Sequence, residues 1–367
     1  LQMLKLFKVS GFKNFRDTLT IDFSDVHDYK FNSECVSNGF LSKMIVYGRN
    51  SVGKTNLGLA IFDIVSHLTE NNVSPGLYDY YLNVESETKR ASFFYVFQFN
   101  RDIIKYGYEK NEKRELVSEC LWINDMLIFS YDTIDETSDY SGIKGISPTL
   151  NHNFEGIESV LKYIVNNTVL SDTHPLKKLM KYVSSMLWFR NLDENRYIGY
   201  KNKSTDYADF IFKPEILKEF QDFLHESGVQ EDLIAKTDSD GIKRLYFDTK
   251  TPLPFFKTAS SGTKALYTFF YWYKTAPDVS FLFMDEFDAY YHYELSESIV
   301  RIIEKMPNTQ VMITSHNTNL LSNRIMRPDC YFILTNERLT ALVNATDREL
   351  REGHNLEKLY MSGEFDE

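Results

Sequence analysis

The sequence predicts an α/β protein built around a mainly parallel sheet, and three observations indicate this fold. Short apolar stretches of strand length alternate with helical patterns near the start of the chain and again after residue 240, as they do when helices connect parallel strands. A glycine-rich loop follows one predicted strand and opens a predicted helix. A later apolar strand ends in two acidic residues, and ligands of such sheets bind at the carboxyl ends of the strands.

The first 150 residues combine strands with one clear helix. Strand patterns occupy residues 5–9, 18–23 and 44–47. Apolar residues at helical spacing predict a helix over residues 54–68. Residues 92–131 then read as strands joined by polar turns, which favours an antiparallel sheet. We therefore assign residues 1–150 to a first lobe that holds the glycine-rich loop and an antiparallel β subdomain.

The rest of the chain contains a helical block and then a return to alternating strands and helices. Residues 151–227 are mostly helical in pattern, so we assign residues 151–235 to a helical insertion. Residues 236–367 form the predicted second lobe. Its expected elements are a helix over 262–274, an apolar run at 279–284, a further helix, and strand patterns at 310–314, 330–334 and 339–343.

The strongest motif matches the phosphate-binding loop G-x-x-x-x-G-K-[ST]. Its glycines let the backbone wrap closely, so that successive amides and the helix N-terminus hold phosphate oxygens. In this pattern the lysine reaches the β- and γ-phosphates, and the threonine hydroxyl binds Mg²⁺. We add the asparagine that follows to the nucleotide-binding residues. The whole stretch is Gly48, Arg49, Asn50, Ser51, Val52, Gly53, Lys54, Thr55 and Asn56.

The second motif is an acid pair at the end of the apolar run. Asp285 and Glu286 directly follow the stretch Phe-Leu-Phe-Met. Next to a phosphate loop, Asp285 is expected to support Mg²⁺ through water, and Glu286 to polarise the attacking water. Taken alone, such a pair is equally a capped strand end. The phosphate loop in the same chain favours the interpretation as a metal and catalytic site.

Two further motifs lie at the start of a predicted helix and just after the end of a predicted strand. Ser260, Ser261 and Gly262 precede an apolar helix, where a hydroxyl, free amides and the helix dipole favour an anion. The alternative for these serines is an ordinary helix N-cap. His316 follows the strand pattern at 310–314 and can donate a hydrogen bond to a phosphate. A lone histidine in such a place is more often structural.

These four motifs, in this order along the chain, resemble those of ABC ATPases. The stretch Ala-Ser-Ser-Gly-Thr-Lys at 259–264 is similar to the ABC signature, whose commonest form is LSGGQ, and His316 is similar to the switch histidine. The opening at residues 7–15 and Asn50 resemble the SMC and RecF branch. The loop at 285–292 carries an acid and a histidine. Together with residues 355–360, it is most similar to OLD nucleases and to small bacterial defence ATPases of the RloA kind.

The resemblance implies an ABC-ATPase head that binds ATP and Mg²⁺ and closes on ATP as a homodimer. Lys54, Glu286 and His316 are its implied catalytic residues, and Thr55 and Asp285 its metal-binding residues. Asn14 joins the phosphate loop in the implied nucleotide site. Ser260, Ser261 and Gly262 are implied to contact the γ-phosphate that the opposite protomer holds, and His316 to sense its loss.

Two positions depart from the ABC pattern. His292 stands where transporter-type and SMC-type proteins place an aspartate, in the loop that links the two ATP sites. Gln98, on a predicted strand, is the candidate for the glutamine-loop residue, and the alternative for it is an exposed strand glutamine.

Composition limits the partners that we expect. The formal net charge of −11 does not indicate the basic footprint of a sequence-independent nucleic-acid binder, although nucleic acid stays open as a partner. The clustered Lys177, Lys178 and Lys181 are a local basic face or a solvated helix face. Three scattered cysteines without a CxxC pair speak against zinc and disulfides and favour a reducing, cytoplasmic setting. No apolar run is long enough to cross a membrane.

The function that we expect is an ATP-dependent dimerising ATPase that drives or restrains a separate effector protein, such as a nuclease, in bacterial antiviral defence. No cluster of acidic residues after the last motif indicates a nuclease domain. The expected docking surfaces are the helical insertion and the tail from residue 355. In the insertion, Leu187, Trp188 and Phe189 face a partner or belong to the core. The alternatives are a RecF-like DNA-repair clamp and, less favoured, a transporter ATPase subunit.

Overall fold

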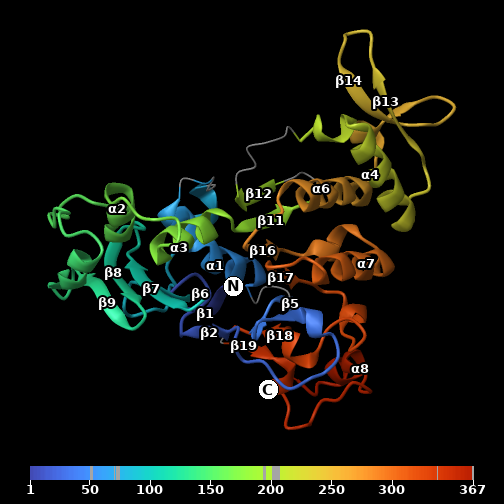
Figure 1. The fold of residues 1–367 in the computed structure, drawn as a ribbon. Helices are drawn as coiled ribbons and strands as arrows, with labels where there is room; N and C mark the ends of the chain where they lie inside the picture. The colour runs from blue at the N-terminus through green and yellow to red at the C-terminus, as the bar shows by residue number, and fades with distance from the viewer. Residues whose placement is uncertain are drawn as a thin grey trace.

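The central sheet is parallel over most of its width and draws strands from both ends and the middle of the chain (Figure 1). The computed structural model describes residues 1–49, 53–69, 71, 75–192, 196–200, 207–336 and 338–365. The parallel strands are, in spatial order, β11 (Leu187–Asn191), β16 (Phe281–Met284), β17 (Gln310–Thr314), β5 (Lys43–Tyr47) and β18 (Tyr331–Leu334). Antiparallel edges are added by β12 (Arg196–Gly199) and β19 (Leu339–Ala341). The predicted fold, a mainly parallel sheet with helices and an antiparallel subdomain, is confirmed.

A second seven-stranded sheet is antiparallel and lies beside the first. Its strand order is β10–β9–β8–β7–β6–β1–β2, so the first strands of the chain pair with the segment expected to form an antiparallel subdomain. The bounds are β1 (Gln2–Ser10), β2 (Leu19–Asp22), β6 (Ala91–Phe99), β7 (Asp102–Lys110), β8 (Leu116–Ile123), β9 (Met126–Asp132) and β10 (Thr137–Asp139).

Two small sheets and the helices complete the architecture. The strands β13 (Leu233–Thr237), β14 (Lys243–Phe247) and β15 (Leu253–Pro254) form one small sheet, and β3 (Val36–Ser37) and β4 (Phe40–Leu41) form the other. In Figure 1, β13 and β14 project beyond α4. The helices are α1 (Lys54–Leu68), α2 (Val160–Asn167), α3 (Pro175–Ser184), α4 (Pro214–Glu226), α5 (Phe255–Thr258), α6 (Ser261–Thr275), α7 (Tyr293–Glu304) and α8 (Leu356–Met361). None of the helices in the described ranges is long and apolar enough to cross a membrane.

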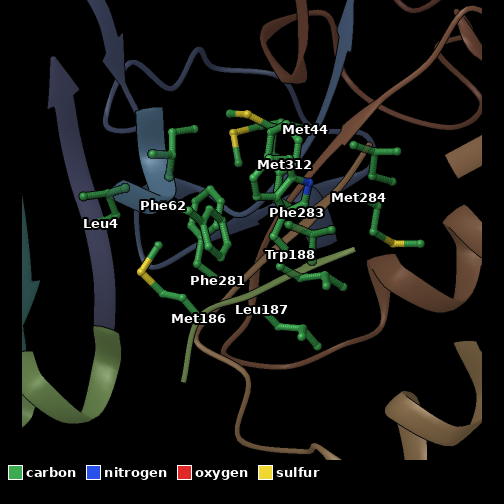
Figure 2. Packing of buried hydrophobic residues seen from close by; sticks show 14 of the residues in the cluster. Leu4, Met44, Phe62, Met186, Leu187, Trp188, Phe281, Phe283, Met284 and Met312 are labelled. Carbon is green, nitrogen blue, oxygen red and sulfur yellow. The ribbon is translucent and has the colours of Figure 1, made fainter. Parts of the chain in front are cut away.

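Helix α1 is packed tightly onto the central sheet (Figure 2). The Phe62 ring lies 5.9 Å from the ring of Trp188 on β11 and 6.2 Å from that of Phe281 on β16, centroid to centroid. One turn earlier, a Cβ added to Gly58 would lie 2.8 Å from the Phe283 ring, closer than real contacts allow. A glycine at this position therefore lets the helix that follows the phosphate loop approach the sheet.

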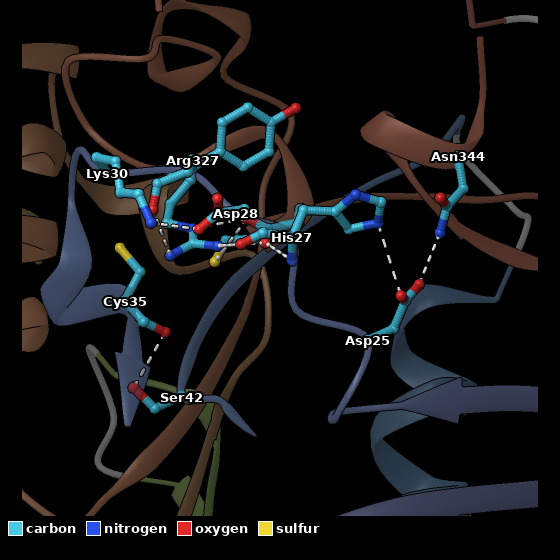
Figure 3. Close-up of polar contacts among 11 residues, drawn as sticks. Asp25, His27, Asp28, Lys30, Cys35, Ser42, Arg327 and Asn344 are labelled. Carbon is cyan, nitrogen blue, oxygen red and sulfur yellow. Dashed lines mark hydrogen bonds and ion pairs between the residues drawn. The ribbon is translucent and has the colours of Figure 1, made fainter. Parts of the chain in front are cut away.

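The N-terminal segment is hydrogen-bonded to a buried ion pair in the C-terminal part of the chain (Figure 3). Arg327 donates to Asp329 and also to the carbonyl oxygen of His27, and the Asp329 carboxylate accepts the backbone amide of His27 at 2.8 Å. Nearby, Asn344 donates to Asp25 at 2.8 Å. Buried charges need partners of this kind, and these contacts join the segment before β5 to the segments that border β18 and β19.

The expectation of a mostly helical block over residues 151–227 was wrong for its central part. Residues 187–199 contribute the strands β11 and β12 to the central sheet. The side chains of Leu187, Trp188 and Phe189 are 1%, 0% and 3% exposed, so the core alternative holds and these residues do not face a partner. The apolar run at residues 187–189 pairs with β16 in parallel. Both strands are apolar because strands of a parallel sheet are buried on two faces. The division at residues 150 and 235 stays a prediction.

We predict that Trp188→Ala lowers the free energy of unfolding by about 3–5 kcal/mol, the usual cost of emptying a large aromatic site in a core. Trp188→Phe is the matched control. In the described structure the indole nitrogen has no hydrogen-bond partner, so phenylalanine loses volume but no bond, and about 1 kcal/mol is expected. Urea denaturation of the three proteins measures both values. A loss within about 0.5 kcal/mol for alanine, as on a surface, would contradict the placement of β11.

Candidate functional site

Most of the candidate functional residues lie at the carboxyl edge of the central sheet. Parallel pairing places Met284 opposite Ile313, and Thr314 opposite Val46, so β16, β17 and β5 end at the same level. The loops that follow these three strands begin with Asp285, Ser315 and Gly48. Three of the four predicted motifs are therefore neighbours in space, as the carboxyl ends of adjacent parallel strands must be.

The phosphate loop connects β5 to α1 as predicted. Gly53 has a φ of 94° at the N-cap of α1, in the left-handed region that favours glycine. A Cβ at this position would also lie within 2.4 to 2.7 Å of the Asn14 amide group. Asn56 donates to the Asn14 side chain at 2.7 Å, so Asn14 and Asn56 flank the start of the helix together. Asn50, Ser51 and Val52 lie outside the described residues.

Lys54 lies at the base of this loop. Its ammonium group donates to the carbonyl oxygen of Gly48 at 3.0 Å, and the residue is 6% exposed. Burial lowers the pKa of Lys54, and the carboxylates of Glu286 and Asp285 oppose that effect. A buried cation at a helix N-terminus is suited to an anion with several charges. Arg49, the second residue of the loop, is exposed.

Asp285 is held between the two neighbouring loops. Its Oδ2 atom accepts the Thr55 hydroxyl at 2.6 Å, and its Oδ1 atom accepts the Thr314 hydroxyl at 2.7 Å. Burial raises the pKa of the Asp285 carboxyl, and the hydrogen bonds from Thr55 and Thr314 oppose this rise. Nearby positive charge would stabilise the carboxylate.

The oxygen pair of Thr55 and Asp285 fits Mg²⁺. The ion takes hard oxygen ligands and usually combines one or two protein groups with waters and substrate phosphates. Across the described ranges, no group of three or more His, Cys, Asp or Glu residues could hold a metal ion by itself. When bound, Mg²⁺ would supply positive charge between the phosphates and this edge of the sheet. Thr55 and Asp285 are the two predicted metal residues, and the structure brings them together.

Glu286 and His316 face each other beyond Asp285. The His316 Nε2 atom lies 3.4 Å from the Glu286 Oε1 atom. Glu286 has a φ of 44°, a left-handed conformation that is costly for a residue with a Cβ and is found where a site requires it. Its backbone amide donates to the Thr314 hydroxyl at 2.7 Å. The carboxylate and the imidazole are therefore both presented beside the phosphate loop.

The fourth motif lies on a different element. Ser260 caps α6, and its Oγ atom accepts the backbone amide of Thr263 at 3.1 Å. The N-cap alternative is thus correct as local geometry. Ser260 and Ser261 are both exposed, and Gly262 is half-buried. The first turn of a 15-residue helix is therefore open to a ligand from outside.

The sequence analysis missed Thr314 and left two alternatives open for Gln98. Thr314 bonds both Asp285 and Glu286, and a hydroxyl at the last position of a buried apolar strand was the signal that could have revealed it. Gln98 pairs with Met3 near the start of β1, whereas Ser10 ends that strand. The Gln98 side chain donates to the Asn100 carbonyl oxygen. Since Asn14 follows the Ser10 end of β1, Gln98 lies at the far end of the sheet, and the alternative of an ordinary strand glutamine fits this position.

A phosphate-loop motif, an acid pair and a histidine loop lie together at one edge of this α/β head, and a protein-family comparison places the chain among proteins with an AAA domain. Residues 43–322 match the family model AAA_21, described as "AAA domain, putative AbiEii toxin, Type IV TA system". The match covers most of the chain, and the chain belongs to this family.

Solved structures resemble the chain in fold at low sequence identity. The Smc head bound to the C-winged helix domain of ScpA has 14% identity and a TM-score of 0.48, over 92% of this chain and 98% of that chain. The SMC head domain from Thermotoga maritima has 14% identity, the same coverages and a TM-score of 0.42. The recombination mediator RecF of the RecFOR pathway has 12% identity and a TM-score of 0.42, over 93% and 98%. No curated protein matches the chain in sequence.

We predict that Lys54→Ala and Glu286→Gln separate binding from hydrolysis. Lys54→Ala removes a charge-assisted bond to phosphate worth about 1.5–3 kcal/mol, so the Kd for ATP with Mg²⁺ should rise by roughly 10- to 100-fold. Glu286→Gln keeps the shape of the side chain, so binding should persist while kcat falls by about 10²–10⁴-fold. Calorimetry and phosphate release measure the two quantities. The exposed Glu155→Gln is the control with unchanged kcat. A Glu286→Gln protein that hydrolyses ATP at the wild-type rate would overturn the assignment.

Proposed function

We propose that this chain binds ATP with Mg²⁺ and hydrolyses it in a homodimer. We further propose that the cycle drives or restrains a separate effector protein in bacterial antiviral defence. The observation that carries the proposal is the Asp285 carboxylate between Thr55 and Thr314, 2.6 and 2.7 Å from the two hydroxyls. It joins the phosphate loop, the acid pair and the histidine loop into one site. The remaining steps follow from the charges around it.

In the proposed reaction, Lys54 binds the β- and γ-phosphates, and the amides of the phosphate loop hold their oxygens. Glu286 accepts a proton from the attacking water, because its side chain is exposed next to the metal-binding pair. His316 donates a hydrogen bond to the γ-phosphate. Phosphoryl transfer requires positioning and charge stabilisation more than covalent chemistry, and these groups supply both.

The dimer is supported by the exposed start of α6. Its N-terminus offers the Ser260 hydroxyl and free amides, which attract an anion, and it lies on a different element from the loop that holds Lys54. We propose that Ser260, Ser261 and Gly262 contact the γ-phosphate bound by a second copy. Two heads would then enclose two nucleotides, and hydrolysis would release them.

Two observations support a separate effector: the residues described account for ATP chemistry alone, and the family description names a toxin–antitoxin system. The described residues contain no cluster of acids or histidines able to hold a catalytic metal apart from the nucleotide site. The family description also supports a role in defence. We propose that a partner docks on the unit formed by α4 and β13–β15 or on the tail from Asn355. The three free cysteines support a reducing, cytoplasmic setting.

The two-protomer site predicts complementation between inactive variants. Ser260→Arg should leave ATP binding by the monomer nearly unchanged and abolish hydrolysis, because the arginine blocks the second protomer. Mixed with Lys54→Ala protein, it forms heterodimers in which one composite site carries both lesions and the other carries neither. Partial ATPase activity should therefore return in the mixture, as a phosphate-release assay can measure. Heterodimers that form without any recovery would contradict a shared site.

The effector proposal predicts ATP turnover without cleavage by the purified chain. The assay combines the protein with duplex DNA, single-stranded DNA or RNA, in ATP with Mg²⁺ or Mn²⁺. We expect phosphate release and intact nucleic acid. Nuclease activity that co-elutes with the chain, and is lost on mutating an acid outside the ATP site, would overturn the proposal. A salt-dependent shift of duplex DNA would favour a RecF-like clamp instead.

A further inference from the structure

We infer that Asp288 is the residue that positions His316 for the reaction. Asp288 lies in the 3₁₀ turn η5 (Phe287–Tyr290), two residues after Glu286. Its Oδ2 atom accepts the Ser315 hydroxyl at 2.7 Å and the backbone amide of Asn317 at 3.1 Å. One carboxylate oxygen therefore binds the residue before the histidine and the residue after it. This inference rests on the proposed function only for its consequence in hydrolysis.

The exposed pair of Glu286 and His316 does not hold its own geometry. Their side chains are 55% and 43% exposed, and their nearest nitrogen and oxygen atoms are 3.4 Å apart. Pairs exposed to this extent contribute about 0–1 kcal/mol, because solvent screens the charges and the side chains lose entropy. Catalysis nevertheless requires the two groups to stay in place, since a misplacement of about 1 Å can cost about 100-fold in rate.

The backbone on which the histidine stands is fixed instead. Ser315 is fully buried, and its Oγ atom donates to Asp288 and accepts the Asn317 amide at 2.9 Å. Tyr47, the last residue of β5, donates to the Asn317 carbonyl oxygen at 3.0 Å. Hydrogen bonds to an ionised acceptor are about twice as strong as neutral ones, so Asp288 supplies the main restraint.

The same loop also orients the acid. Glu286 and Asp288 lie on one turn, and the Glu286 amide donates to Thr314, the residue before Ser315. The turn that carries the general base is thus hydrogen-bonded to the histidine loop at Thr314, Ser315 and Asn317. A movement of one loop would carry the other with it. Asp288 therefore acts through His316 and is a positioning residue that makes no contact with ATP in this scheme.

The test compares Asp288→Ala and Asp288→Asn with wild-type protein. We expect kcat to fall by about 100-fold for alanine and by about tenfold for asparagine, which keeps an acceptor but loses the charge. KM for ATP should change by less than about threefold, because the phosphate loop is untouched. Asp278→Asn, an exposed acid before β16, controls for net charge. A raised KM with unchanged kcat would overturn the inference.

A double-mutant cycle separates positioning from a general structural role. In a His316→Ala background, Asp288→Ala should change kcat by less than about twofold, because the group that it positions is gone. Ser315→Ala alone should reproduce part of the loss, and adding it to Asp288→Ala should cost nothing more. If Asp288→Ala fails to fold, Ser315→Ala alone tests the inference, because it removes one of the two hydrogen bonds to the Asp288 carboxylate. Ser296→Ala, at another buried serine, is the matched control. Losses that multiply fully in the His316→Ala background would contradict the inference.

Histidine spectra keep this test independent of the proposed function. In protein labelled with ¹⁵N-histidine and measured without nucleotide, the peaks assigned by His316→Ala should shift or broaden in Asp288→Ala and stay in place in Asp278→Asn. If wild-type protein hydrolyses no ATP, the proposed function fails, and these spectra still decide the placement of His316. Unchanged His316 peaks in Asp288→Ala would overturn the inference even where ATPase activity is present.

Discussion

The site depends on the Asp285 carboxylate and the two hydroxyls that bind it. Thr55 begins the helix after the phosphate loop, and Thr314 ends the strand before the histidine loop, so their bonds to Asp285 connect three loops on adjacent strands. Burial makes the Asp285 carboxyl costly to ionise and raises its pKa, and the two hydroxyls offset part of that cost. A cation bound beside Thr55 would offset more. Because the apolar sheet beneath Asp285 makes the carboxylate costly to ionise, the nearby Lys54 ammonium group, and a cation if one binds, would stabilise its charged form.

Packing below the edge explains why the carboxylate can be held so closely. Gly58 removes the side chain that would separate α1 from Phe283, and Phe62 then lies against Trp188 and Phe281. Protein interiors are dense and shift little when the contacts are complete. Thr55 lies one turn before Gly58 on the same helix, so the approach of the helix to β16 also sets the distance from Thr55 to Asp285.

The parts of the site that sequence reasoning predicted are those fixed by local pattern. The helix over 54–68 and the strand over 310–314 have the predicted bounds, because glycine, lysine and the apolar run mark their ends. The strand β11 was missed because its run of Leu187, Trp188 and Phe189 is too short to distinguish strand from helix, and its pairing partner lies almost a hundred residues later. The alternatives for Gln98 stayed open for a related reason. Residue type alone allowed a role in the ATP site, but the register of β1 with β6 decides at which end of the sheet the side chain lies.

The central claim is that this edge binds ATP and that a second copy completes the site. We propose that the exposed first turn of α6 and the buried Lys54 form complementary halves of an anion site, and each copy of the chain carries both. The most direct measurement is sedimentation velocity of Glu286→Gln protein with ATP and Mg²⁺, because slow hydrolysis preserves the bound state. We predict a species of twice the 43.0 kDa chain mass, which disappears without nucleotide. Protein that binds ATP stoichiometrically and still sediments at 43.0 kDa would contradict the account.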